Sequence, residues 1–227
     1  YSSIVDMVKI ENCVGMGKNR VPYEKKRAEA ADTQTEGQSG STKEAEFGYV
    51  DILPESVLVL SQISKQARKQ SPVNYAGKVQ ENAMTSLKKK ASKLIIDALK
   101  ASKLNTVIDA KVQGAKGVID EKTLRNLTLN YGGDESVIGT AVLFLNKEDL
   151  IAFGDIRGTN EKKAVYEINP DSENPNTGII KDGGLSVRYC LNNNLTACSG
   201  TAQQESSGED VLTMCYGNPK CFELDLF

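Results

Sequence analysis

Histidine and tryptophan are absent from this 227-residue sequence, and no apolar run approaches the length of a membrane helix. Histidine is the commonest general base and a frequent metal ligand near neutral pH, so its absence excludes Ser-His-Asp and Cys-His catalysis. A membrane helix needs about 18 to 20 consecutive apolar residues, and no signal-type segment follows Tyr1. These absences predict a soluble protein that is not an enzyme, with no cofactor, no small-molecule substrate and no membrane partner.

The five cysteines form no metal-binding pattern. Cys13, Cys190, Cys198, Cys215 and Cys221 are irregularly spaced, none of them forms a Cys-x-x-Cys pair, and no histidine is present to complete a zinc site. We predict free thiols and no metal. A disulfide between Cys190 and Cys198, or between Cys215 and Cys221, stays open because each pair is close in sequence.

Other short motifs have simpler structural explanations. Residues 15–19 (GMGKN) lack the first glycine and the final Ser or Thr of a phosphate-binding loop, and are typical of a hairpin turn. The glycine pairs at 132–133 and 183–184 do not have the G-x-G-x-x-G spacing of a dinucleotide site. The acidic pairs at 134–135 and 148–149 fit a turn and a first helical turn better than general acid and base catalysis. We therefore predict no catalytic residues.

Positive charge is concentrated in one segment. Residues 61–104 contain ten Lys or Arg against Glu81 and Asp97, so the segment is +8, and the rest of the chain, whose total is -2, is -10. Such a run is typical of a solvated helix face, but it leaves open an alternative function, a nucleic-acid-binding protein that uses the basic helix 71–101. Against this alternative, only Arg68 is an arginine and only Tyr75 could stack on a base.

The same region predicts one long helix. Ser71 and Pro72 are a favourable helix start, and apolar residues then follow at helical spacing to about Ala101. The helix would have roughly 29 residues and span about 43 Å. We expect it to lie along an extended ribbon and to bury one stripe, formed by Ala76, Val79, Ala83, Leu87, Ala91, Leu94 and Ala98.

The residues before this helix predict strands and an arm. Alternation in 5–10 and in 20–23 indicates a hairpin around the glycine turn. Residues 24–46 are polar and contain no apolar residue larger than alanine, so we expect an arm that either contacts a neighbour or moves. The β-rich runs 47–53 and 56–61, separated by Pro54, predict two further strands.

The residues after the helix predict a compact α/β region. A short helix is expected in 121–127. The apolar run 140–145 reads as a buried strand, and Asn146 should cap a helix that follows it. Further strands are expected in 163–168, 185–189 and 221–227.

This order of parts resembles the tailed-phage major capsid proteins of the Hong Kong ninety-seven-type coat fold. The matching stretches are residues 36–47 for the end of an extended loop, 57–99 for the ribbon and spine helix, and AVLFLNKEDLIAF (141–153) with KKAVYEI (162–168) for the axial domain. Residues 183–197 and 214–227 are similar to the late segments of coat proteins from phages of Gram-positive hosts. The family usually extends beyond both ends of this sequence, so the chain is expected to be truncated at each end.

The resemblance implies an α+β fold with an extended loop, a long spine helix on a β-ribbon and a compact α/β axial domain. The implied parts are N-terminal strands in 1–23, the extended loop in 24–46, a peripheral domain in 47–104 and the axial domain in 105–227. The implied function is a structural subunit that self-assembles, as pentamers and hexamers, into the icosahedral head shell of a tailed phage or prophage. Its partners would be other copies of itself and, non-specifically at the inner surface, packaged double-stranded DNA. The implied location is the virion, with assembly in the host bacterial cytoplasm.

Overall fold

The computed structural model describes residues 3–26, 45–60, 75–102, 108, 111–113, 116–131, 141–158, 163–198 and 211–226. The chain divides into two compact units. The first unit contains Tyr1–Lys9 and Val59–Phe222, and the second contains Ile10–Leu58 and Glu223–Phe227. Helices and strands are mixed along the sequence, which confirms the predicted α+β class.

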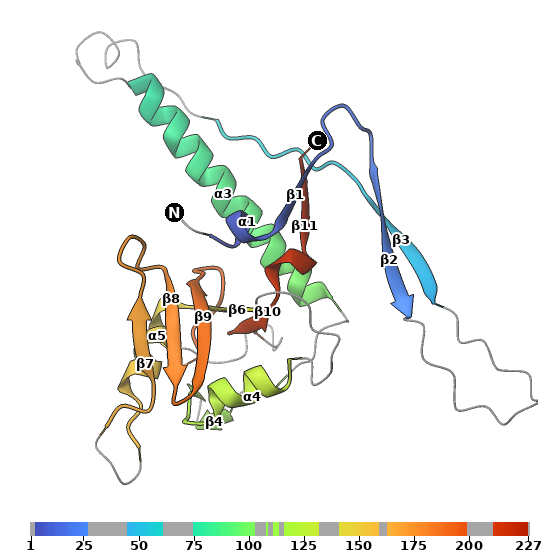
Figure 1. The fold of residues 1–227 in the computed structure, drawn as a ribbon. Helices are drawn as coiled ribbons and strands as arrows, with labels where there is room; N and C mark the ends of the chain where they lie inside the picture. The colour runs from blue at the N-terminus through green and yellow to red at the C-terminus, as the bar shows by residue number, and fades with distance from the viewer. Residues whose placement is uncertain are drawn as a thin grey trace, which may run out of the picture. The chain divides into compact units, whose positions relative to one another are not determined.

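The centre of the first unit is a five-stranded mixed sheet (Figure 1). Its strand order is β10-β6-β9-β8-β7, with a parallel pairing between β6 and β9 and antiparallel pairings elsewhere. The strands are β6 (Val142–Leu145), β7 (Glu167–Pro170), β8 (Thr177–Asp182), β9 (Leu185–Leu191) and β10 (Cys215–Gly217). The sequence predicted β6, β9 and part of β7, but not β8 or β10.

Strand β6 is buried over its whole length, as its continuous apolar run predicted. Leu143 and Leu145 belong to one core cluster with Phe153 of helix α5 (Lys147–Asp155) and Leu124 of helix α4 (Thr123–Leu129). Because side chains alternate along a strand, Val142 and Phe144 face the other side of the sheet, where they are also buried. Both faces of the sheet are therefore covered at β6.

Helix α5 begins where the sequence predicted. The side chain of Asn146 accepts a hydrogen bond from the backbone N–H of Glu148 at 3.1 Å, as an N-cap residue does. Its amide also donates to the carbonyl of Leu195 at 2.8 Å, so one residue caps the helix and fixes a distant loop. Phe153 meets Tyr166 edge to face in the core, with ring centroids 5.0 Å apart.

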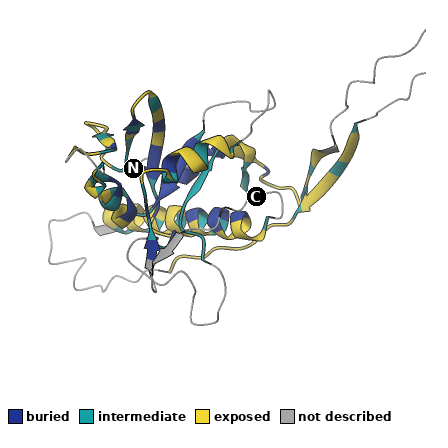
Figure 2. Cartoon of the chain, turned by 90° about the horizontal axis from the view of Figure 1, so that it is seen from below, coloured by how far each residue is buried: buried dark blue, intermediate teal, exposed yellow. Residues whose placement is uncertain are grey.

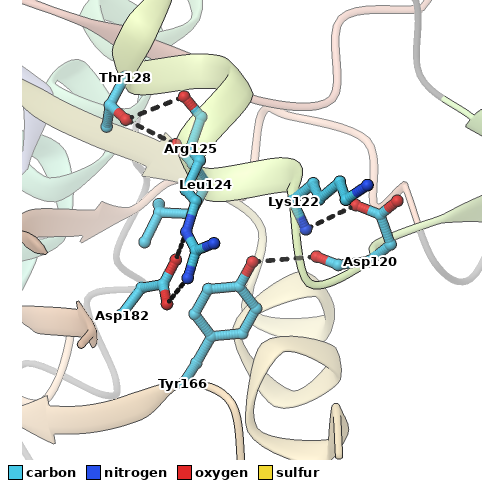
Figure 3. A network of polar contacts seen from close by, with 7 residues as sticks. All are labelled: Asp120, Lys122, Leu124, Arg125, Thr128, Tyr166 and Asp182. Atoms are coloured by element: carbon cyan, nitrogen blue, oxygen red, sulfur yellow. Dashed lines mark hydrogen bonds and ion pairs between the residues drawn. The ribbon is translucent and has the colours of Figure 1, made fainter. Parts of the chain in front are cut away.

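A buried ion pair joins α4 to the sheet (Figure 3). The guanidinium of Arg125 donates two hydrogen bonds to the carboxylate of Asp182, at 2.6 and 2.8 Å. Asp182 is only 3% exposed at the end of β8, although the Arg125 side chain is more than half exposed. Beside it, the hydroxyl of Tyr166 donates to the backbone carbonyl of Asp120 at 3.0 Å. Burial raises the pKa of Tyr166 to about 12, so the phenol remains a donor at neutral pH.

Two glycines are required by the β7–β8–β9 meander. Gly183 has a φ of 58° in the tight turn between β8 and β9, a conformation that favours glycine. At Gly178 of β8, an added Cβ would lie 2.5 Å from the Asn169 carbonyl oxygen and 2.8 Å from the Tyr189 ring. The pair Gly183 and Gly184 thus forms a hairpin turn, a structural use of a motif that did not fit a dinucleotide site.

Helix α3 (Tyr75–Ala101) is unbroken over 27 residues. This confirms the predicted long helix, except that the proposed Ser71 and Pro72 start lies outside the described residues. The hydroxyl of Ser92, two-thirds of the way along the helix, accepts hydrogen bonds from the side-chain amides of Asn192 and Asn194, at 3.2 and 3.0 Å. None of the helices in the described part of the chain has the length and apolar character that spanning a membrane requires.

The buried face of α3 is not the predicted one. The buried residues are Ser92, Ile95, Ile96 and Leu99, all in the last ten residues of the helix. The described residues of the predicted stripe, from Val79 to Leu94, are only half-buried, and Ala98 is exposed. Successive helix residues are about 100° apart, so the two faces are centred roughly 140° from each other. The prediction that the stripe is buried within the chain was wrong, because helical spacing cannot tell which of two apolar faces the fold covers.

The N-terminal residues form a short helix where a strand was expected. Helix α1 (Ile4–Met7) starts with a capping box between Ser3 and Asp6, and Ile4 and Val5 are buried. The Asp6 carboxylate accepts a hydrogen bond from the Lys88 ammonium of α3 at 3.1 Å. Strand β1 (Lys9–Asn12) follows and pairs with β11 (Glu223–Leu226), after the 3-10 helix η1 (Pro219–Cys221). Two small strands, β4 (Lys111–Gln113) and β5 (Lys116–Val118), form a separate hairpin.

The second unit contains a two-stranded ribbon of β2 (Asn19–Lys26) and β3 (Glu46–Ile52). The predicted hairpin around residues 15–19 was therefore wrong, since β1 and β2 belong to different sheets. Gly15, with a φ of 87°, still makes a turn there. The predicted strand in 56–61 is also not observed, because residues 53–60 have no regular structure and Leu58 and Leu60 are strongly exposed.

All five cysteines are free thiols, so neither of the open disulfide alternatives is formed. Burial raises the pKa of Cys190 and of Cys215 to about 11. A thiol with such a pKa is almost fully protonated at neutral pH and is a poor nucleophile. These two cysteines therefore act as small apolar side chains of the sheet.

We predict that Ile96→Ala lowers the free energy of unfolding by about 2–5 kcal/mol, because Ile96 is 1% exposed and its truncation leaves a cavity. The matched variant Leu87→Ala, in the half-buried stripe of the same helix, should cost less than half as much. Urea denaturation followed by circular dichroism measures both. If the two variants lost equal free energy of unfolding, the assignment of Ile96 to the buried face of α3 would be contradicted.

We also predict that Arg125→Met lowers the urea midpoint, because it leaves the Asp182 carboxylate buried without its ion-pair partner. Arg188→Met is the control, since it removes an exposed arginine from β9 of the same sheet. Arg188→Met should leave the midpoint nearly unchanged. If the two variants unfolded at the same urea concentration, the ion pair would not be what holds α4 on the sheet.

Candidate contact surfaces

The described acidic residues that were considered as catalytic candidates take part in the hydrogen bonds of a helix start. Asp149 is fully buried in the first turn of α5 and accepts a hydrogen bond from the backbone N–H of Cys198 at 3.0 Å. Glu148 is exposed beside it and contributes its N–H to the helix cap. Asp134 and Glu135 lie outside the described residues. Across the described ranges, no three Cys, Asp or Glu side chains are grouped so that they could hold a metal ion.

The ribbon β2–β3 presents two distinct faces. Directly opposed residues of an antiparallel pair point to the same side, and successive residues alternate between sides. We define the Phe47 face by the pairs Arg20–Asp51, Pro22–Tyr49 and Glu24–Phe47. We define the Val50 face by the pairs Asn19–Ile52, Val21–Val50 and Tyr23–Gly48.

Charged and aromatic groups are joined on the Phe47 face. Arg20 donates to Asp51 through Nε at 2.7 Å and through a terminal nitrogen at 3.0 Å, and Lys18 lies 3.4 Å from the same carboxylate. The hydrogen bond from Arg20 holds the pKa of Asp51 at about 2, so the pair remains charged at neutral pH. The Arg20 guanidinium also lies over the Tyr49 ring, 4.1 Å from its centroid. These contacts fix the orientation of Tyr49.

The two faces differ in exposure. All six residues of the Phe47 face are exposed, with Phe47 at 69% and Tyr49 at 62%. On the Val50 face, Asn19, Val21, Gly48 and Ile52 are half-buried, and the Asn19 amide donates to Asp225 of β11 at 3.0 Å. Figure 2 shows the ribbon in the colours of exposed and intermediate residues only. The Phe47 face is thus a large apolar and aromatic surface that the described chain leaves in contact with water.

The predicted arm begins and ends on this ribbon. Residues 24–26 belong to β2 and Glu46 to β3, while 27–44 lie outside the described residues. The arm contains three lysines, Lys25, Lys26 and Lys43. Lys25 and Lys26 lie in β2, and Lys43 is outside the described residues.

The basic residues of α3 form an exposed line. At about 100° per residue, Lys78, Lys89, Lys93 and Lys100 fall within a sector of roughly 60°, and all four are exposed. Lys88 is on another side of the helix, where it pairs with Asp6. The sequence predicted a basic segment, and the helix shows which of its lysines share a side. Lys65, Arg68, Lys69 and Lys103, which the sequence also placed in the basic segment, lie outside the described residues.

Sequence analysis missed the Phe47 face itself. The run 47–53 predicted a strand, but residues 20–23 were expected to pair with 5–10, so Arg20 could not be placed beside Tyr49 and Asp51. The polar arm between β2 and β3 separates these residues by about thirty positions. Only the register of the folded ribbon shows that they share a face.

Comparison with known proteins identifies the fold. A search of curated proteins finds no match. Among solved structures, a chain from Mycobacterium phage Cain is similar, with a TM-score of 0.63 and 13% sequence identity. The similarity covers 98% of this chain and 69% of the phage chain. At this identity, the likeness concerns the fold alone.

Comparison with protein families is more specific. Residues 1–179, which include the ribbon, α3 and strands β6 and β7 of the five-stranded sheet, match the phage capsid family. This match confirms the resemblance drawn from the order of the arm, the long helix and the α/β region. The chain therefore belongs to the phage capsid family, whose members are structural proteins of the virion.

Proposed function

We propose that this chain is the major capsid subunit of a tailed phage or prophage, and that it self-assembles into an icosahedral head shell enclosing double-stranded DNA. The family match over residues 1–179 is the observation that supports this function most directly. The fold similarity to a chain from a mycobacteriophage agrees with it. The shell would assemble in the cytoplasm of the host bacterium.

The proposed division of the chain follows the family. Residues 1–23 are the N-terminal strands, 24–46 the extended loop, 47–104 the peripheral domain with the spine helix, and 105–227 the axial domain. The antiparallel pairing of β2 and β3 supports the loop, because it makes the chain leave and return along one ribbon. The uninterrupted 27-residue α3 supports the spine helix.

The mechanism of such a subunit is the geometry of its contacts with other copies. In pentamers and hexamers the axial domains would meet at a symmetry axis, and the extended loop would reach over a neighbour. The exposed aromatic side chains of the ribbon support this arrangement. A two-stranded ribbon is marginally stable by itself in water, and cover from a neighbour would stabilise it.

Packaged DNA is the second proposed partner. The exposed line of lysines on α3 supports contact with DNA phosphates. Because the members of this line are all lysines, with no arginine or aromatic side chain to read bases, we expect binding without sequence preference. Contacts of this kind are electrostatic and weaken as salt is added.

We predict that the purified chain associates into rings of capsomer size or into closed shells as its concentration rises, because the family functions as an assembly of identical copies. Analytical ultracentrifugation and negative-stain electron microscopy would measure this. A chain that stays monomeric at every accessible concentration would contradict the proposed self-assembly.

The alternative function is a dedicated nucleic-acid-binding protein, which the lysine line on α3 favours. We predict weak binding to duplex DNA that disappears by roughly 200 mM salt, since each phosphate contact contributes a slope of about -0.9 to log K against log salt. Lys89→Glu with Lys93→Glu should abolish it, whereas Lys122→Glu with Lys147→Glu, exposed lysines elsewhere, should not. Tight binding that persists at physiological salt, without self-association, would favour the alternative.

A further inference from the structure

The two faces of the ribbon β2–β3 differ in exposure, and this difference indicates which face another copy of the chain would contact. The Val50 face is partly covered by the chain itself, because Asn19 bonds to Asp225 and four of its six residues are half-buried. All six members of the Phe47 face are exposed. A partner that covers the ribbon would gain most by contacting the Phe47 face.

The Phe47 face also has the composition of an interface centre. Tyrosine, phenylalanine and arginine are enriched at the energetically dominant positions of protein interfaces. Tyr49 is held in place by Arg20, which is itself fixed by two hydrogen bonds to Asp51. Little side-chain entropy remains to be lost there on binding, so the surface is preorganised.

The charge of this face points to the class of partner. Within the face, Arg20 is balanced by Asp51, and Glu24 adds one negative charge. Lys18, which lies beside Asp51, offsets this charge, so the face and its border are close to neutral. A neutral aromatic surface does not suit a phosphate backbone, which needs a net positive charge. It suits a protein of low net charge, and this chain, at -2, is one.

We propose that the Phe47 face, and not the Val50 face, is the side of the ribbon that a second copy of this chain covers, with Phe47 and Tyr49 as its anchors. This inference rests on the proposed function, because it requires that copies assemble. Pro22 lies opposite Tyr49 and extends the apolar surface between the two anchors. Arg20 and Asp51 act as positioning residues that orient Tyr49 and remain at the rim.

The test compares matched substitutions on the two faces. Phe47→Ser and Tyr23→Ser each remove an exposed aromatic ring, at 69% and 42% exposure, from neighbouring rows on opposite sides of the ribbon. Tyr49→Ser and Val50→Ser, at 62% and 52%, form a second pair of adjacent residues. Sedimentation velocity across a concentration series measures association, and circular dichroism melting checks that each variant is folded.

We expect Phe47→Ser and Tyr49→Ser to weaken association on the order of tenfold or more, and Tyr23→Ser and Val50→Ser to change it by less than about twofold. Because Tyr49 also contacts Arg20, Phe47→Ser is the decisive variant if Tyr49→Ser melts at a lower temperature. A photo-crosslinking phenylalanine analogue at position 47 should give covalent dimers, and the same group at position 23 should not.

The outcomes separate this inference from the proposed function. If the unmodified chain does not associate, the proposed function fails and this inference fails with it. If the unmodified chain associates but Tyr23→Ser and Val50→Ser weaken it as much as Phe47→Ser, or if no variant weakens it, self-assembly stands and the choice of face is wrong.

Discussion

Burial of strand β6 on both of its faces is the constraint on which the first unit depends. Leu143 and Leu145 pack with residues of α4 and α5, while Val142 and Phe144 are buried on the other side of the sheet. Strand β6 also pairs with β9 on one edge and with β10 on the other. A strand without a solvent-facing side must have cover on both faces, and α4 and α5 provide it on the side of Leu143 and Leu145.

Helix α3 is buried over only part of its length. Ile95, Ile96 and Leu99 are buried, and Ser92 bonds to two asparagines that follow β9. The stripe from Val79 to Leu94 is left half-buried on a different side of the helix. A 27-residue helix thus has one face used within the unit and a second apolar face along its length, as expected of a subunit that functions beside other copies.

The ribbon β2–β3, like α3, has one side that the chain partly buries and another side that it leaves exposed. Its Val50 face is partly covered by the chain, and its Phe47 face exposes two aromatic rings beside a fixed ion pair. Family membership makes this exposure intelligible, because capsid proteins function as assemblies of copies. An exposed aromatic surface promotes aggregation of a monomer, but in an assembly of copies it can form part of an interface.

The sequence by itself determined the local elements: the long helix, the Asn146 cap, the buried β6, the α+β class and, through the order of parts, the family. These follow from periodicity, capping and apolar runs, which act over a few residues. Tertiary structure alone decided which face of α3 is buried and that β2 pairs with β3 across the arm. Those outcomes depend on which distant surfaces compete to be covered, and no local pattern contains that information. The Phe47 face could not be found from sequence for the same reason.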